Sequence, residues 1–186
     1  MPNSPSHPPG DLPPDLPDHE ETVGPDWLDY NGHMNVAYYV MAFDHAVDKF
    51  LNHIGIGRDY RENTGHSVFV VEAHSTYKLE AHAGDGLRIT TRVLDHDDKR
   101  LRVFQHMYRL EENGDGNGDD KEGPGDLAAT NEWMFLHVNL ESRRAAAFPD
   151  EASERIASLS RTHSALPRPD QAGRAIGLKP KPSAAN

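Results

Sequence analysis

Hydrophobic residues recur every three or four positions between residues 36 and 54, and this spacing predicts an amphipathic helix. The apolar stripe consists of Val36, Tyr39, Val40, Phe43, Val47, Phe50 and Ile54. Asn35 is a suitable N-cap and Gly55 a suitable terminator, so we expect a helix of about 19 residues. Each apolar side chain stabilises the fold by roughly 1.5–3 kcal/mol when buried, so this stripe should form the main part of the core.

Alternating apolar and polar residues after this helix predict antiparallel strands. The expected strands are 67–80, 87–95, 100–111 and 127–140. The segment 112–126 has turn residues but no apolar ones, which predicts a flexible connection between the last two strands. An antiparallel sheet with one apolar face can bury it against one long helix with one apolar stripe. The pattern therefore predicts a single α+β domain in which the sheet wraps around the helix.

The two ends of the chain differ from this domain in composition. Residues 1–22 are rich in Pro and Asp, which predicts a disordered acidic tail. Val23–Leu28 is expected to enter the fold as a short strand. Pro149 is expected to open a short helix to about residue 162, followed by an extended basic tail. The predicted organisation is a tail at 1–22, a folded domain at 23–149 and a C-terminal helix with its tail at 150–186.

The net charge of −11 is concentrated in two segments. Residues 1–22 carry −5 and residues 111–126 carry −6, so the remainder is neutral and a basic surface for nucleic acid is not expected.

The chain has no cysteine, which excludes disulfides and thiolate sites. The first twenty residues contain no apolar run, so we expect no secretory signal, no membrane partner and a cytoplasmic protein.

A polar cluster stands just before the long helix. Asp29, Asn31 and His33 occupy alternate positions there, where free backbone N–H groups and the helix dipole favour negative charge. A carboxylate, an amide and an imidazole in this position indicate a catalytic or binding site. From the residues alone, a simple capping loop is an equally good interpretation.

Other common catalytic patterns are missing from the sequence. The twelve histidines include no His-Glu-x-x-His or comparable ligand spacing, and the pairs His74/His82 and His96/His106 are interpreted as ordinary strand and loop positions. The chain has no Gly-x-Ser-x-Gly motif for a nucleophilic serine. The sequence therefore predicts no metal and no cofactor.

The run Asp29-Tyr30-Asn31-Gly32-His33-Met34-Asn35, placed before a long helix and ahead of the strands, resembles the hotdog-fold thioesterases of the 4-hydroxybenzoyl-CoA thioesterase-like superfamily. Plant acyl-carrier thioesterases have an Asp-x-Asn-x-His-Val-Asn run in the same place. The likeness covers roughly residues 23–149. Further segments are similar to the betainyl-CoA thioesterases of carnitine catabolism: Ser67–Glu72, Gly84–Leu87, Asp98–Leu101 and Leu127–Thr130.

This resemblance implies an acyl-CoA thioesterase that acts on a small acyl-CoA, betainyl-CoA in the most similar branch. It also implies a side-by-side homodimer with sites at the interface, with a tetramer left open. Pairing the strand at 67–80 with its twin would remove an exposed sheet edge. A thioesterase for another short-chain or aromatic acyl-CoA, a hotdog hydratase or dehydratase, and a non-catalytic acyl-CoA-binding module remain alternatives.

The resemblance assigns catalytic roles to the polar cluster. Asp29 would be the general base or nucleophile, and Asn31 would orient the water or bind the carboxylate. His33 would hydrogen-bond the substrate or Asp29. Backbone N–H groups of residues 35–37 would stabilise the carbonyl oxygen, and Glu72 would face the helix start across the dimer. For each residue the alternative is an ordinary loop or strand position.

The substrate itself suggests further binding residues. A betainyl group ends in a quaternary ammonium, which aromatic faces and a nearby negative charge would recognise. The substrate-binding candidates are Trp27, Tyr30, Asn35, Tyr38 and Trp133, with Glu72 as the countercharge. The phosphates of CoA require positive charge, for which Lys99, Arg100 and Arg102 are the candidates, or the basic end beyond Arg155.

Overall fold

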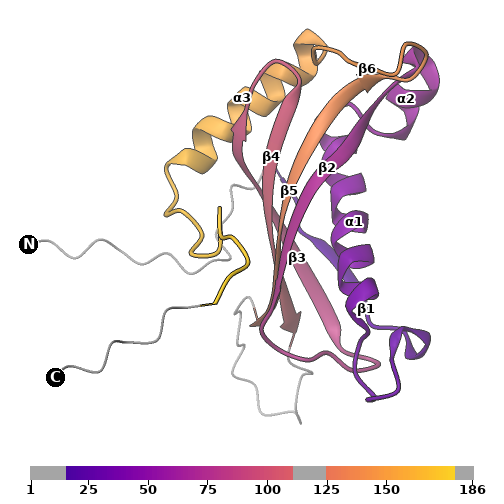
Figure 1. The fold of residues 1–186 in the computed structure, drawn as a ribbon, viewed down its shortest axis with the longest axis vertical. Coiled ribbons are helices and arrows are strands. Elements are labelled where there is room, and N and C mark those ends of the chain that lie inside the picture. The colour runs from indigo at the N-terminus through magenta and orange to yellow at the C-terminus, as the bar shows by residue number, and fades with distance from the viewer. Residues whose placement is uncertain (1–15, 111–124, 179–186) are drawn as a thin grey trace, which may run out of the picture.

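A curled antiparallel sheet wraps around one long helix in the computed structural model of this protein, and another helix lies on the opposite face of the sheet (Figure 1). The structure describes residues 16–110 and 125–178. The strands are β1 (His19–Thr22), β2 (His66–Tyr77), β3 (Gly86–His96), β4 (Arg100–Leu110), β5 (Asp126–Asn139) and β6 (Arg144–Ala145). The helices are the short 3-10 helix η1 (Pro25–Trp27), α1 (Val36–His53), α2 (Arg58–Thr64) and α3 (Asp150–Ser164). This arrangement confirms the predicted α+β architecture.

The central helix α1 begins and ends close to the predicted positions. The side chain of Asn35 caps it by accepting a hydrogen bond from the N–H of Ala37 (2.9 Å). At the other end, Ile54 is the C-cap and Gly55 follows with φ of 85°, a left-handed conformation that favours glycine. The cap and the terminator are therefore those expected from the sequence.

The buried face of α1 is rotated relative to the predicted stripe. Val36 and Val40 are exposed, whereas Ala42 and Ala46 are buried together with the aromatic residues of the stripe. Alanine is small enough to let the helix backbone approach the sheet closely, so the contact face is centred nearer the alanines. The two valines lie at its margin, and the prediction that they are buried is wrong.

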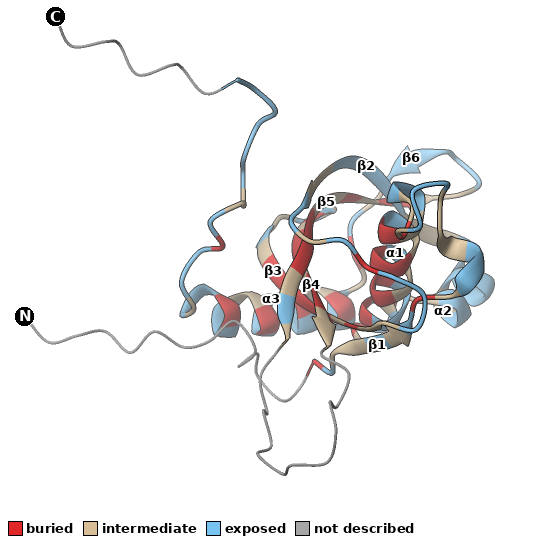
Figure 2. Ribbon diagram, turned by 90° about the horizontal axis from the view of Figure 1, so that it is seen from below, coloured by how far each residue is buried: buried red, intermediate tan, exposed pale blue. Residues whose placement is uncertain are grey.

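The sheet has the strand order β1-β3-β4-β5-β2, and all pairs are antiparallel. The short strand β6 pairs with the end of β5. Strand β2 therefore lies at an edge, as the sequence predicts. Figure 2 shows it largely exposed, in contrast to the buried β3, β4 and β5. Its exposed apolar side chains are Phe69, Val70, Val71 and Tyr77.

The structure corrects the predicted start of the domain. Residues 19–22 form β1 and pair with residues 86–89 of β3, so the last part of the predicted disordered tail belongs to the sheet. The predicted strand Val23–Leu28 is wrong, because Pro25 instead opens η1. The pairing of β1 depends on a partner strand distant in sequence, which local composition does not reveal. Residues 1–15 lie outside the described ranges.

The C-terminal part of the chain covers the outer face of the sheet. Helix α3 packs against β3 on the face opposite α1 (Figure 1). The buried guanidinium of Arg92 on β3 donates to the carbonyl oxygens of His163 (2.7 Å), Leu166 (2.7 Å) and Pro167 (2.5 Å), at the end of α3. Burial lowers the pKa of Arg92. Further along, the N–H of Gly173 donates to the carboxylate of Glu132 on β5 (2.6 Å), which fixes the segment after α3.

Two further expectations can be compared with the described residues. The predicted flexible connection 112–126 lies outside the described ranges except for its last two residues, and β5 begins at Asp126. Within the described ranges, no helix has the length and apolar character needed to cross a membrane.

Candidate active site

The polar cluster before α1 forms a tight hairpin. Leu28 and Met34 make an antiparallel bridge, and the N–H of Asp29 donates to the carbonyl oxygen of His33 (2.9 Å). The turn closes with a hydrogen bond from the N–H of Gly32 to the carbonyl oxygen of Asp29 (3.0 Å). Gly32 has φ of 81°, which explains glycine at this position of the turn. The motif therefore folds as one compact turn that presents its side chains ahead of the helix.

The carboxylate of Asp29 is held on one side and open on the other. Its Oδ1 atom accepts a hydrogen bond from the backbone N–H of Asn31 (2.7 Å). No donor among the described residues reaches Oδ2. Asn31 thus contacts the carboxylate through its backbone, as one of its two predicted roles requires, while its amide side chain is exposed. This geometry leaves Oδ2 available to a water molecule or a substrate.

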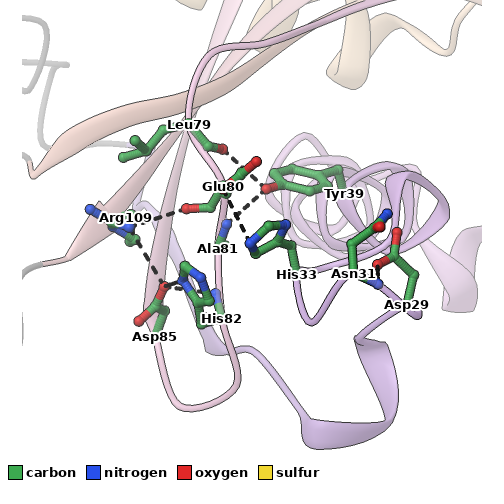
Figure 3. A network of polar contacts seen from close by, with 10 residues as sticks. All are labelled: Asp29, Asn31, His33, Tyr39, Leu79, Glu80, Ala81, His82, Asp85 and Arg109. Carbon is green, nitrogen blue, oxygen red and sulfur yellow. Dashed lines mark hydrogen bonds and ion pairs between the residues drawn. The ribbon is translucent and has the colours of Figure 1, made fainter.

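His33 points away from Asp29 and toward the loop between β2 and β3 (Figure 3). Its Nε2 atom lies 3.2 Å from a carboxylate oxygen of Glu80, and its ring stands edge-on to His82 at 5.0 Å. Among the described residues the His33 imidazole therefore makes no hydrogen bond to the Asp29 carboxylate, which was one of its predicted roles. Glu80 was missed by sequence reasoning because it follows the last apolar residue of a strand and has no motif of its own.

This loop is fixed to the helix by Tyr39. The Tyr39 hydroxyl donates to the carbonyl oxygen of Leu79 (3.1 Å) and accepts from the N–H of Ala81 (3.1 Å). Burial raises the pKa of the Tyr39 hydroxyl. The carbonyl oxygen of Ala81 in turn accepts from the N–H of Met34 (2.7 Å). The hairpin, the loop and the first turn of α1 are therefore locked together.

A cation that the sequence reasoning missed, Arg109 on β4, lies beside this loop (Figure 3). Its guanidinium donates to the backbone oxygen of Glu80 (3.1 Å) and lies 4.0 Å from a carboxylate oxygen of Asp85 and 3.8 Å from one of Asp126. Asp85 also accepts from the N–H of His82 (2.8 Å). Arg109 thus places a cation beside this loop, where two carboxylates already face it.

The predicted CoA-phosphate residues lie at the other end of the sheet. Lys99, Arg100 and Arg102 flank the start of β4, whereas Arg109 is near its end, and eleven residues of strand span roughly 35 Å. Arg100 is paired with Asp97, whose pKa is held well below its usual range by the hydrogen bond from Arg100 and by nearby backbone N–H groups. Within one subunit, these cations are not brought together with Asp29.

Of the backbone N–H groups of residues 35–37, two have acceptors among the described residues and one is open. The N–H of Asn35 donates to the carbonyl oxygen of Trp27 (2.9 Å), and that of Ala37 donates to the side chain of Asn35 (2.9 Å). The N–H of Val36 has no acceptor among the described residues. Of the three predicted donors for a carbonyl oxygen, Val36 is the one that remains open.

The aromatic residues predicted to bind substrate differ in burial and in contacts. Trp27 and Tyr38 stack on each other beside the hairpin, with ring centroids 5.4 Å apart and planes at 8°. Tyr30 is 97% exposed. Trp133 is only 4% exposed, and its indole N–H donates to the buried side-chain oxygen of Gln105 (2.7 Å). Both the ring and the N–H of Trp133 are used in the core of the subunit, which argues for a structural role, and its assignment to substrate binding stays a prediction.

A hollow of about 840 Å³ lies between α1, α2 and β2. Asp44 and Asp48 of α1 and Val68 and Val70 of β2 are among its lining residues. Burial, together with the charge of Asp48, raises the pKa of Asp44. Glu72 is exposed on the same edge strand.

Sequence comparisons identify relatives of this chain. Residues 23–156 match the Thioesterase-like superfamily. The chain is 37% identical over 162 residues to a betainyl-CoA thioesterase from Pseudomonas aeruginosa. This match covers 87% of this chain and 94% of that protein. It is 38% identical over 164 residues to an L-carnitine dehydrogenase/betainyl-CoA thioesterase from Agrobacterium fabrum, covering 87% of this chain and 31% of that longer protein.

Solved structures agree with this relationship. A Staphylococcus aureus protein solved in complex with CoA has a TM-score of 0.74 and 32% identity, and the match covers 87% of this chain and 94% of that one. A 1,4-dihydroxy-2-naphthoyl-CoA thioesterase from Synechocystis has a TM-score of 0.63 at 17% identity, covering 76% and 96%, and shows that the fold is shared. The family match, the identity over most of the chain and the shared fold confirm the resemblance seen in the motif. This chain belongs to the thioesterase-like superfamily and is a hotdog-fold thioester hydrolase.

Proposed function

We propose that this protein is an acyl-CoA thioesterase that hydrolyses betainyl-CoA to glycine betaine and CoA. One observation carries the proposal. Asp29 has an open Oδ2 atom, and the hairpin that holds it leads directly into α1, where the N–H of Val36 is also open. A base and a backbone donor beside a helix N-terminus are what thioester hydrolysis needs. The similarity to betainyl-CoA thioesterases over most of the chain supports the choice of substrate.

The reaction requires few groups. Asp29 takes a proton from a water molecule whose oxygen attacks the carbonyl carbon, and the C–S bond then breaks with release of the CoA thiolate. In the alternative route, the Asp29 carboxylate attacks the carbonyl carbon, the C–S bond breaks with release of the CoA thiolate, and water then hydrolyses the mixed anhydride to the free acid and the Asp29 carboxylate. In both, the N–H of Val36 donates to the carbonyl oxygen as it gains negative charge, a contribution of roughly 3 kcal/mol for one donor in other enzymes.

We also propose that the protein is a homodimer joined along β2. The exposed apolar residues of this edge, among them Val70 and Val71, would be covered by a second copy. A two-fold axis reverses the direction of the paired strand, so the Tyr77 end of one copy meets the His66 end of the other. The Asp29 hairpin lies near the Tyr77 end, and the hollow between α1 and α2 lies near the His66 end. The site would then be shared between two subunits.

The dimer would bring the distant cations and Glu72 to the same site. The start of β4 lies at the His66 end of the sheet, so Lys99, Arg100 and Arg102 of one copy would be on the side of the hairpin of the other. Glu72 is close to the midpoint of β2 and would lie near the two-fold axis. Arg109 is the competing phosphate partner within the subunit.

A cationic acyl group fits the residues around this site. The stacked rings of Trp27 and Tyr38 are only partly buried, and each aromatic contact with a cation is worth about 0.5–2 kcal/mol. Asp44 and Asp48 add negative charge to the hollow. The longer relatives combine L-carnitine dehydrogenase and betainyl-CoA thioesterase in one name, which supports a role in carnitine catabolism.

A thiol-release assay with betainyl-CoA and butyryl-CoA tests the proposal. The two acyl groups differ in charge, so cation recognition should give a higher kcat/KM for betainyl-CoA. Equal values would refute the substrate assignment but not thioester hydrolysis. Water addition to an enoyl-CoA, or tight acyl-CoA binding with no thiol released from any substrate, would instead identify a hydratase or a binding module.

A further inference from the structure

A second polar cluster lies between β1 and α1, and the proposed reaction does not use it. The carboxylate of Glu21 stands between two imidazoles: Oε1 is 3.2 Å from Nε2 of His19, and Oε2 is 2.9 Å from Nδ1 of His45. His19 and Glu21 are alternate residues of β1 and therefore project from the same face of the strand. One potential ligand atom from each of the three side chains lies within 4.8 Å of the others.

Two atoms of this cluster are buried without a hydrogen-bond partner among the described residues. They are Nε2 of His19 and Oε1 of Glu21, which face each other at 3.2 Å in an orientation that does not form a hydrogen bond. The two side chains are 21% and 16% exposed. Buried polar atoms in proteins ordinarily have partners. A metal ion would satisfy both atoms, because each can direct a lone pair toward it.

We propose that His19, Glu21 and His45 form a binding site for Zn²⁺ or a similar divalent transition-metal ion, with water as the fourth ligand. Two imidazole nitrogens and a carboxylate favour Zn²⁺, Co²⁺ and Ni²⁺ over Mg²⁺ and Ca²⁺. Metal–ligand bonds of about 2.1 Å in a tetrahedral site separate the ligand atoms by about 3.4 Å. The two contacts of Glu21 are close to this value. The side chain of His45 is 42% exposed and can rotate to complete the site.

The ion would act as a structural clip. It would join the four-residue strand β1 to α1 and so stabilise the folded state, to which alone it binds. His45 lies ten residues beyond Asn35 on α1, a distance of about 15 Å along the helix. The clip is therefore separate from the Asp29 hairpin, and chelation should lower the melting temperature without changing kcat.

Titration of the tag-free protein with Zn²⁺ against a chromophoric chelator tests this proposal. We expect one ion per chain and a rise in Tm of about 5–10 °C at an excess of about 100-fold over Kd. His45→Gln and Glu21→Gln should each weaken binding by more than about 100-fold, since loss of a second-shell partner alone costs about 10–100-fold. His53→Gln, on the same helix, should retain wild-type binding.

The results distinguish specific metal binding at these three residues from nonspecific binding to other histidines. Wild-type affinity in His45→Gln, or an equal loss in His53→Gln, would overturn the proposal. The Tm of each variant without metal shows whether it folds. If Glu21→Gln is unfolded, His45→Gln decides, because its partly exposed position tolerates the change. With Co²⁺ as the probe, a four-coordinate visible absorption spectrum is expected for the wild type, and its absence would also contradict the site.

Discussion

The imidazole of His33 and the carboxylate of Glu80 lie 3.2 Å apart, although one belongs to the hairpin before α1 and the other to the loop after β2. Removing the acceptor charge by Glu80→Gln should loosen His33 and lower kcat/KM several-fold. The matched control is Glu154→Gln at an exposed position of α3. A double-mutant cycle with His33→Gln should be non-additive, because the two side chains act as a pair. Full additivity would mean that the contact has no role in turnover.

The carboxylate of Asp29 should be essential for hydrolysis. In Asp29→Asn the amide keeps the size of the side chain but can neither take a proton from water nor attack, so kcat should fall by about 100- to 10,000-fold. The melting temperature should change little, since the side chain is partly exposed. Asp26→Asn, on the adjacent 3-10 helix, is the control. Turnover of Asp29→Asn at the wild-type rate would remove this residue from the mechanism.

Positive charge for the CoA phosphates can be assigned by comparing two arginines. If Arg109 binds a phosphate in its own subunit, Arg109→Gln should raise KM several-fold with little effect on kcat, whereas Arg100→Gln should not. The reverse result would indicate that the phosphates bind across the dimer at the start of β4. Arg88→Gln, which removes the ion pair with Glu20 on β1, controls for a general loss of surface charge.

Trp133 should matter for stability and not for substrate choice. Trp133→Phe retains most of the apolar volume but leaves the buried oxygen of Gln105 without its donor. An unsatisfied buried acceptor costs about 1–3 kcal/mol, which equilibrium unfolding in urea would detect. The ratio of kcat/KM for betainyl-CoA and butyryl-CoA should be unchanged. A shift in this ratio with no loss of stability would place Trp133 in the binding site.

The protein should lose stability in mild acid. Burial, reinforced by the charge of Arg92, lowers the pKa of His106 to about 4. Burial also lowers the pKa of His137, whose ring is hydrogen-bonded to Tyr60 (3.0 Å). In the unfolded chain both titrate near 6.5 and bind protons that the folded protein excludes. Their contribution is therefore complete above pH 6.5 and decreases as the pH falls toward 4, by about 3 kcal/mol for His106.

Unfolding free energies measured between pH 7 and pH 4 test this dependence. His106→Gln should flatten the curve relative to the wild type, because the titrating group is gone. His53→Gln, at the end of α1, should leave the slope as it is. An unchanged slope in His106→Gln would show that other groups cause the loss.

The sequence predicted the features that depend on local pattern. The spacing of apolar residues gave α1, and the cap at Asn35 and terminator at Gly55 gave its ends, because caps and periodicity act within a few residues. The edge position of the strand at 66–77 followed from its family resemblance and its apolar alternation. The polar residues before the helix fold as a compact turn, and their catalytic role stays a prediction.

Features that depend on distant contacts were missed. Strand β1 exists because β3 offers it a hydrogen-bonding edge, and no local signal in its acidic sequence indicates this. Glu80 reaches the hairpin from the loop after β2, and Arg109 reaches that loop from the end of β4, a juxtaposition created only by the sheet. The contact of Trp133 with Gln105 was missed because Gln105 lies on a neighbouring strand and cannot be identified from the sequence around the tryptophan.

The position of α3 limits how two dimers can assemble. An α-helix with its side chains is about 10 Å across, which equals the distance between two sheets packed face to face. Because α3 and the segment fixed to Glu132 occupy the outer face of the sheet, a second sheet has no room to stack on the part that they cover. A tetramer built from β2-linked dimers therefore cannot stack sheet on sheet over this part of the outer face.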